Sequence, residues 1–209
     1  MTLRLIFIRH GLSSFNKKGR IQGRNNLSTL TKEGQSQAEA AGKIISCIPI
    51  DAIYSSPLQR ASETTKIIIK HHQNTIKATY TDDLLEVDLG PWSGLTKDEL
   101  KNLYPEQLSI WEKEPTELSI QREDGSKFKP IENLLLQAEI FLKYLFKSYF
   151  DSNKTILIVA HNAILRCLIL KLINEPSKGF RRIKLDNTSI SICNIDFNSW
   201  EDRKVQIQC

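Results

Sequence analysis

Two histidines follow apolar runs of the kind that form buried strands. Residues 3–8 (LRLIFI) end at Arg9 and His10, and residues 155–160 (TILIVA) run directly into His161. In open α/β sheets ligands bind beyond the carboxyl ends of the strands, so chemistry is expected at Arg9 and His10. Either histidine alone could instead cap its strand by bonding to a neighbouring carbonyl group. Because two of the four histidines end apolar strands, the pair favours a functional site.

A second set of residues indicates anion chemistry. Ser56 is expected to cap a helix whose first residue is the proline after it, which places Arg60 in the first helical turn. A guanidinium beside the positive end of a helix is unfavourable unless an anion, such as a phosphate, compensates both. The alternative is a side chain that extends into solvent. The loop 17–26, which contains Gln22 and Gly23, could bind an oxyanion, although a plain surface loop would have the same composition.

One of the carboxyl groups near Glu86 is predicted to be suited to proton donation. Glu86 lies in an acidic stretch, 82–94, that would ordinarily be a solvated loop. Its apolar neighbours indicate a partly apolar wall, which raises the pKa of a carboxyl group. These neighbours are Leu85, Val87, Leu89 and Trp92.

The elements that must position these groups alternate between strands and helices, which predicts an α/β fold: a three-layer α/β/α sandwich around a mostly parallel sheet. We expect one domain over residues 1–209, with a lid or specificity insert at about 95–130. His71 and His72 are predicted to be surface residues in the turn 71–74. The expected strands are 3–8, 51–55, 78–81, 155–160, 189–195 and the edge strand 205–209. The expected helices are 32–46 with Thr31 as its cap, 58–70, 96–104, 105–114, 131–149 and 163–173.

Composition restricts the class of protein. The chain has 209 residues, 40% of them hydrophobic, a net charge of +5 and no apolar run long enough to span a membrane. Scattered lysines and arginines would suit a phosphorylated metabolite, and no basic stripe interleaved with aromatic residues supports nucleic-acid binding. Four widely spaced cysteines and an immediate first strand predict reduced thiols, no signal peptide and a cytoplasmic protein. The end of the chain in a strand leaves open a longer polypeptide, and the oligomeric state is also open, with a homodimer as one option.

Several ordered motifs resemble the histidine phosphatase superfamily, in its phosphoglycerate mutase-like branch. The resemblance extends from Arg4 to about Ile195, and five ordered matches carry far more information than one tripeptide. The matching residues are Arg9-His10-Gly11, Asn16, Gln22-Gly23, the block 54–61, Leu85-Glu86 with Gly90, Trp92 and Gly94, and Ala160-His161.

The resemblance implies a metal-independent phosphomonoesterase that hydrolyses a small phosphorylated metabolite and requires no cofactor. His10 would attack phosphorus as a neutral imidazole and become the phosphohistidine, and Glu86 would act as general acid and base. Arg9, Arg60 and His161 would surround the transferred phosphoryl group. Further phosphate or substrate contacts are implied for Ser13, Asn16, Gln22, Gly23 and Asn162.

The sequence departs from the family pattern at three places. Leu12-Ser13 replaces the usual Glu-Thr, Asn162 replaces a glycine, and the stretch 25–31 lacks the customary aspartate and proline. Two alternatives therefore accompany the phosphatase. One is a cofactor-dependent phosphoglycerate mutase, which in most relatives has a longer chain and the glutamate that Leu12 replaces. The other is a phosphate-binding regulatory domain without turnover, against which His10, Glu86 and His161 argue.

Overall fold

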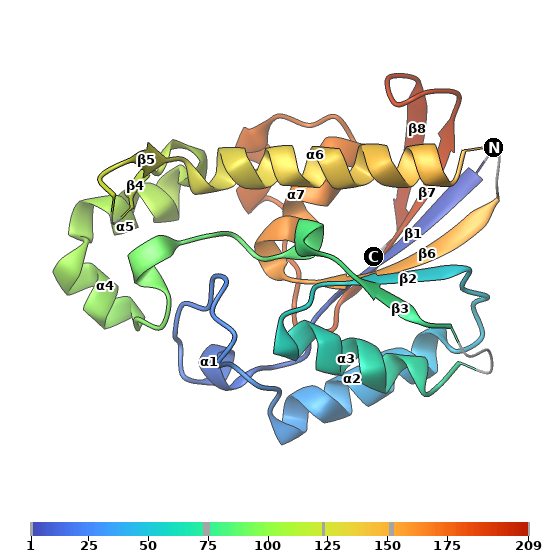
Figure 1. Cartoon of the computed structure of the whole chain (residues 1–209), viewed down its shortest axis with the longest axis horizontal. Helices are drawn as coiled ribbons and strands as arrows, with labels where there is room; N and C mark the ends of the chain where they lie inside the picture. Colours follow the sequence, from blue (N-terminus) through green and yellow to red (C-terminus); the bar gives the residue numbers. More distant parts are fainter. Residues whose placement is uncertain (1, 73–75, 123, 151–152, 209) are drawn as a thin grey trace.

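A six-stranded sheet forms the centre of the structure, a computed structural model that describes residues 2–72, 76–122, 124–150 and 153–208 (Figure 1). The strand order is β3-β2-β6-β1-β7-β8. The first four strands run parallel, whereas β7 and β8 pair antiparallel with their neighbours. The predicted mostly parallel α/β fold is confirmed. The strands are β1 (Thr2–Arg9), β2 (Ala52–Ser55), β3 (Ala78–Tyr80), β6 (Lys154–Ala160), β7 (Ile190–Phe197) and β8 (Arg203–Gln208).

Helices cover both faces of the sheet, which explains why the first strand has an unbroken apolar run over residues 5–8. Leu3, Leu5 and Phe7 of β1 join the core cluster that includes α6 and α7. Ile6 and Ile8 face the opposite cluster, which includes α2 and α3. Figure 1 shows α6 and α7 above the sheet and α2 and α3 below it, the predicted three-layer arrangement. These helices are α2 (Lys32–Ile45), α3 (Gln59–Ile69), α6 (Pro130–Ser148) and α7 (Asn162–Leu172).

The region expected to form an insert lies at one end of the molecule, at the left in Figure 1. Its two short helices are confirmed, and they are followed by a small hairpin where the sequence showed little periodicity. The elements here are α4 (Lys97–Leu103), α5 (Pro105–Lys113), β4 (Ile120–Gln121) and β5 (Lys127–Phe128). The short α1 (Ser14–Lys17) and 3-10 turns at Asp82–Leu84, Gly90–Trp92, Pro115–Glu117 and Ser177–Arg181 complete the described elements.

The predicted start of the α3 helix is wrong. The helix begins at Gln59, and Leu58 at the capping position has extended backbone angles and makes no side-chain cap. The Gln59 N–H donates instead to the side-chain oxygen of Asn26, 2.6 Å away. Ser56, the predicted cap, has its hydroxyl beside His161. A cap supplied from 33 residues away has no local sequence signal, so the capping rule chose the nearest hydroxyl.

The adjacent histidines are less exposed than predicted. His71 and His72 are both half-buried, and the His71 ring hydrogen-bonds to the carboxylate of Glu39 in α2. A histidine at the end of one helix can reach a neighbouring helix, which the local polar sequence did not reveal. Gln73 and Asn74, the rest of that predicted turn, lie outside the described residues.

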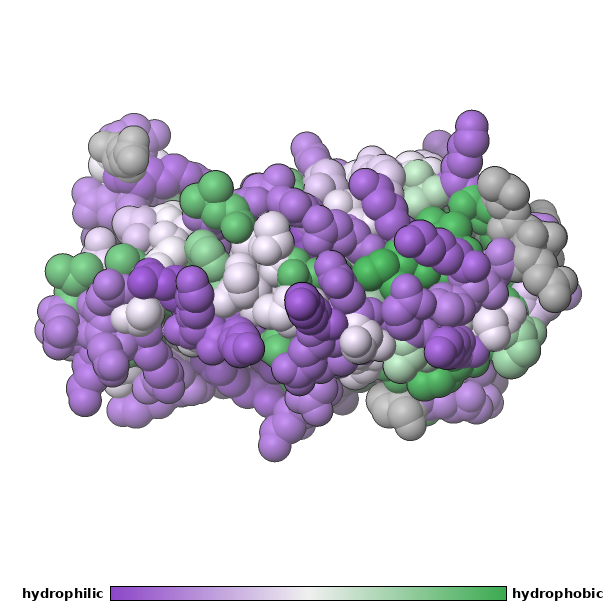
Figure 2. Space-filling model, turned by 90° about the horizontal axis from the view of Figure 1, so that it is seen from below, coloured by the Kyte–Doolittle hydropathy of each residue, from purple (hydrophilic) through white to green (hydrophobic). Residues whose placement is uncertain are grey.

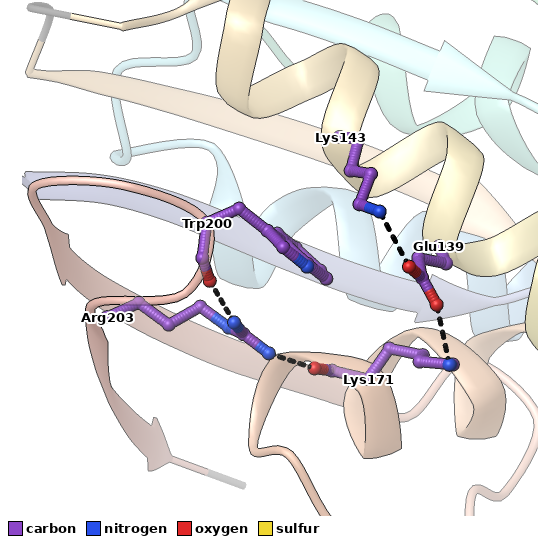
Figure 3. Close-up of polar contacts among 5 residues, drawn as sticks. All are labelled: Glu139, Lys143, Lys171, Trp200 and Arg203. Atoms are coloured by element: carbon purple, nitrogen blue, oxygen red, sulfur yellow. Dashed lines mark hydrogen bonds and ion pairs between the residues drawn. The ribbon is translucent and has the colours of Figure 1, made fainter.

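Charged groups tie α6 to α7, and α7 to the start of β8 (Figure 3). The Glu139 carboxylate accepts from Lys143 and Lys171 at 2.7 Å each, and these two ammonium groups lower the pKa of Glu139 to about 2. The Arg203 guanidinium bonds to the carbonyl groups of Trp200 and Lys171. The helices of the upper layer are thus joined by polar contacts at their edge as well as by their buried apolar faces.

The outer surface of the lower layer is mostly polar. Figure 2, seen from the α2 and α3 side, shows hydrophilic residues over most of that face, with separate apolar areas among them. None of the helices in the described residues combines the length and the apolar character that crossing a bilayer would require.

Thr31 caps α2 as predicted and also holds the loop that follows β1. Its hydroxyl accepts from the Gly34 N–H and donates to the Leu12 carbonyl, both at 3.0 Å. We expect Thr31→Ala to lower the free energy of unfolding by about 1 kcal/mol in urea titrations, because both contacts are lost. Ser36→Ala removes an exposed hydroxyl from the same helix and should cost less than about 0.5 kcal/mol. Equal losses for the two variants would contradict the role of Thr31.

Candidate active site

Strand register brings the two strand-ending histidines together. Arg9 of β1 pairs with Ala160 of β6, so His10 and His161 leave neighbouring parallel strands at the same edge. Their ring centroids are 5.1 Å apart, and both side chains are buried. Two imidazoles at this separation can contact one phosphoryl group from different sides.

The His10 ring is oriented with one nitrogen free. Its Nδ1 lies 2.8 Å from the carbonyl oxygen of Gly11, and donation to that oxygen leaves the Nε2 lone pair available. Burial and the charge of Arg60 lower the pKa of His10 well below its ordinary value, so the ring is neutral at neutral pH. Gly11 is required here, because a Cβ atom would lie 2.4 Å from the backbone oxygen of Gly34.

His161 is held by the hydroxyl of Ser56, which lies 2.7 Å from its Nε2. Its buried Nδ1 has no hydrogen-bond partner within the described residues. Burial, Arg60 and His10 lower the pKa of His161, in that order. The ring therefore has one nitrogen fixed by the protein and one that can bond to a ligand.

Two arginines supply positive charge beside the rings. Arg60 is completely buried in the first turn of α3, and its terminal nitrogens donate to the carbonyl groups of Gly23 and Asn25 at 2.9 and 2.8 Å. Arg9 donates to the Leu185 carbonyl at 2.7 Å. Neither guanidinium has an ion pair among the described residues, and both Nε groups lack a partner there. Burial lowers the pKa of Arg60 to about 10, which still leaves it charged at neutral pH. Buried cations without carboxylate partners suit an anionic ligand.

Glu86 does not lie in the apolar wall that the sequence predicted. Its carboxylate is half-buried and contacts the N-terminus of α7, where it accepts from the N–H groups of Ala163 and Ile164 at 3.1 to 3.2 Å. The neighbouring N–H of Val87 donates as well, at 2.9 Å. Val87, Leu89 and Trp92 are buried in the core rather than packed around the carboxylate. The approach of a helix 77 residues away could not be read from the local sequence.

The loop residues form a cluster of their own. The Ser13 hydroxyl lies 2.9 Å from the side-chain oxygens of both Asn16 and Gln22. Gly23 joins this loop to the arginine site through its carbonyl bond with Arg60. Its φ of +49° favours glycine, and a Cβ atom would lie 2.8 Å from the Ser93 hydroxyl. Of these residues, Gly23 contacts a residue of the histidine site, because its carbonyl group accepts from Arg60. Ser13, Asn16 and Gln22 hydrogen-bond to one another.

Asn162, which replaces the usual glycine, begins α7 with helical geometry. Its side-chain amide donates to the Leu185 carbonyl at 3.3 Å, the same oxygen that Arg9 uses. A side chain is tolerated here because it points to this carbonyl group.

Three supporting residues were missed by sequence reasoning. Thr64 is buried, accepts from the Gly11 N–H at 3.1 Å and donates to the Arg60 carbonyl at 2.7 Å. Asn187 donates to the His10 carbonyl at 2.8 Å, and Ser56 bonds to His161. Thr64 carried a weak signal, since it lies one helical turn after Arg60, but the other two come from distant segments.

A separate cavity lies between the 88–92 turn and the hairpin of the insert region. Its volume is about 860 Å³, and its lining combines aromatic, amide and charged side chains. Among its lining residues are Asp88, Trp92, Tyr104, Gln107, Arg122 and Phe128. No group of three or more histidine, cysteine or acidic side chains placed to hold a metal ion occurs in the described residues.

This arrangement can perform phosphoryl-group chemistry. It combines a neutral His10 ring with a nitrogen free to attack, arginines with unsatisfied donors, and the Glu86 carboxyl group at the N-terminus of α7. Such donors stabilise the charge of a transferring phosphoryl group.

Comparison with known proteins gives an independent result. The sequence profile of the histidine phosphatase superfamily (branch 1) matches residues 5–208. The chain is 33% identical over 196 residues to a probable 2-carboxy-D-arabinitol-1-phosphatase of Arabidopsis thaliana, covering 94% of this chain but 38% of that protein. It is also 33% identical to a 2,3-bisphosphoglycerate-dependent phosphoglycerate mutase of Parvibaculum lavamentivorans, covering 80% of this chain and 79% of that protein. The structure of Bacillus stearothermophilus YhfR superposes with a TM-score of 0.85 at 24% identity, covering 99% and 96% of the two chains, and shares the fold.

Proposed function

The chain belongs to branch 1 of the histidine phosphatase superfamily, and from this premise we propose that it is a metal-independent phosphomonoesterase. Its substrate is a small phosphorylated metabolite, and His10 carries the phosphoryl group as a phosphohistidine. One observation carries the proposal: the neutral His10 ring, with Nε2 free, has its centroid 5.1 Å from that of His161, in a site that also holds the buried Arg60 and the half-buried Arg9. The family binds phosphorylated small molecules, which these cations suit.

In the first step, Arg9, Arg60 and His161 bind the phosphoryl oxygens and His10 Nε2 attacks phosphorus. The P–N bond forms as the bond to the ester oxygen breaks, and protonated Glu86 gives its proton to the departing alkoxide. Because the cations are already in place and desolvated, they stabilise the transition-state charge without rearrangement. The guanidinium groups supply the positive charge that a metal ion supplies in other phosphatases.

In the second step, water attacks phosphohistidine. The Glu86 carboxylate takes one proton from the water, the new P–O bond forms, and the P–N bond breaks to release phosphate and restore neutral His10. In this proposal Asn16, Gln22, Ser13 and the Asn162 N–H lie beside the substrate, and the 95–130 region selects it.

Two observations bear on the wider setting. Cys47 and Cys167 are free thiols among the described residues, which supports a cytoplasmic location. The chain spans 38% of the Arabidopsis relative and 79% of the mutase, so the activity of either relative remains a proposal for this one.

A phosphoglycerate mutase is the second candidate, and the 33% identity to a named mutase supports it. The two functions differ in the acceptor, which is water in a phosphatase and a bound hydroxyl group in a mutase. Release of inorganic phosphate from 3-phosphoglycerate supports the phosphatase, whereas movement of the group between hydroxyls with little release supports the mutase.

The phosphatase proposal is tested by a screen of phosphorylated metabolites in the presence and absence of EDTA. We expect at least one phosphomonoester to release phosphate at the same rate in both conditions, because the arginines and histidines supply the charge. Loss of all activity in EDTA, with recovery on addition of a divalent cation, would overturn metal independence. No phosphate release from any ester would instead support a regulatory domain.

A further inference from the structure

The α7 helix carries an arginine, Arg166, one turn beyond the N-terminal N–H groups that bond to Glu86. Glu86 contacts the N–H of Ala163, and Arg166 follows one turn later on the same side of the helix. In the proposed function, Glu86 protonates the leaving oxygen, so the alcohol part of the substrate lies over this first turn. Arg166 is therefore the next charged side chain along the path of the leaving group.

The Arg166 side chain is half-buried and has no polar partner among the described residues. It makes no hydrogen bond or ion pair within the part of the chain that the structure describes, and its buried Nε has no partner there. The guanidinium lies over the ring of Phe180, with 5.3 Å between the guanidinium carbon and the ring centroid. A partly buried cation without an anionic partner is costly, so a bound anion would compensate it.

The charges around Arg166 are mainly positive. Burial lowers the pKa of Arg166, the charges of Arg181 and Arg9 lower it further, and Glu86 acts in the opposite direction. Arg181 follows Phe180 directly, and Trp111 fixes it by accepting its hydrogen bond and by lying 5.4 Å beneath its guanidinium. Arg166 therefore lies against the Phe180 ring, and a second cation, Arg181, follows Phe180 in the chain.

Arg24, an exposed cation near Glu86, is less suitable than Arg166 for binding an anion. Arg24 donates through Nε to the Glu86 carbonyl and through its terminal nitrogen to Gln137, at 3.1 and 2.9 Å. Its donors are engaged within the protein, whereas those of Arg166 are not. The difference assigns the role of anion binding to Arg166 rather than to Arg24.

We propose that Arg166, assisted by Arg181, binds a second anionic group on the alcohol part of the substrate, a carboxylate or a further phosphate. The inference rests on the proposed phosphatase function, and it defines the substrate as a phosphate ester with two negatively charged ends. The planar guanidinium can hold either group through two parallel hydrogen bonds.

Matched pairs of esters test this assignment. Glycerol 3-phosphate and 3-phosphoglycerate differ in one carboxylate, and 3-hydroxypropyl phosphate and propane-1,3-diol bisphosphate differ in one phosphate. We expect the wild-type protein to prefer the doubly anionic member of one pair by about tenfold or more in kcat/KM. Arg166→Gln should reduce that ratio to about twofold or less, and Arg166→Lys should restore part of it. The pair that responds identifies the group.

Arg182→Gln is the control, because it removes an exposed cation next to Arg181 and should leave the ratio as in the wild type. Equal kcat/KM values within both pairs, or an equal loss for both members in Arg166→Gln, would overturn the inference. Calorimetric titration with the same esters separates it from the phosphatase proposal. A binding preference that depends on Arg166, without any phosphate release, would support the anion site and reject the phosphatase.

Discussion

His10→Ala is expected to abolish covalent labelling by a phosphomonoester and to reduce phosphate release by about a thousandfold or more. Removal of a nucleophile leaves only the contribution of binding and charge stabilisation, which His161 and the arginines would still provide. The measurement is a rapid acid or base quench after mixing with substrate. Phosphohistidine is labile in acid and survives in base, so the labelled protein should show that pattern in the wild type and no label in the variant.

The substitution must be separated from loss of fold, because His10 is buried and its ring bonds to Gly11. His10→Asn retains a side-chain donor for that carbonyl group and should also fail to become labelled, while its thermal midpoint stays close to that of the wild type. His71→Ala serves as a matched control, since its ring contacts Glu39 far from the sheet edge and labelling should continue. Undiminished acid-labile phosphate on either His10 variant would show that another residue is the nucleophile.

The positions of the paired imidazoles could be predicted because they depend on local pattern and general topology. An apolar run marks a strand covered on both faces, and parallel neighbouring strands end at one edge. The register between Arg9 and Ala160 then places His10 beside His161 with no further information. The helices around the sheet could also be predicted from the sequence, since their apolar residues recur at helical spacing.

Several partners of the site residues could not be predicted, because they come from distant segments of the chain. The His161 ring bonds to Ser56, 105 residues away, although the local sequence favoured that hydroxyl as a helix cap. The terminal nitrogens of Arg60 donate to backbone carbonyl groups of the loop that contains Gly23. Every residue has a backbone carbonyl group, so the sequence does not indicate which of them will accept. The apolar neighbours of Glu86 were expected to surround a carboxylate, but Val87, Leu89 and Trp92 pack in the core, whereas the Glu86 carboxylate accepts from the N-terminus of α7.

Glu86→Gln is expected to separate the two halves of the reaction. Glutamine retains the side-chain oxygen that accepts from Ala163 and Ile164, so the contact with α7 can persist while the transferable proton is lost. With an alkyl phosphate, which needs protonation of the leaving oxygen, we expect turnover to fall by about a hundredfold to ten-thousandfold. With p-nitrophenyl phosphate, whose leaving group is stable as an anion, the first step should be slowed far less.

Water attack on phosphohistidine still needs a base, so the Glu86→Gln variant should accumulate the intermediate when it is given p-nitrophenyl phosphate. Stopped-flow measurement should show a burst of about one p-nitrophenolate per active site followed by a slow phase, and base quench should recover a matching amount of phosphohistidine. Asp88→Asn removes a carboxylate from the same loop, where it bonds to the Gly90 N–H, and should give no burst beyond that of the wild type. If Glu86→Gln instead hydrolyses both esters at wild-type rates, proton transfer belongs to another group. If both esters slow equally and no intermediate accumulates, the carboxylate acts before phosphoryl transfer, for example by fixing the N-terminus of α7.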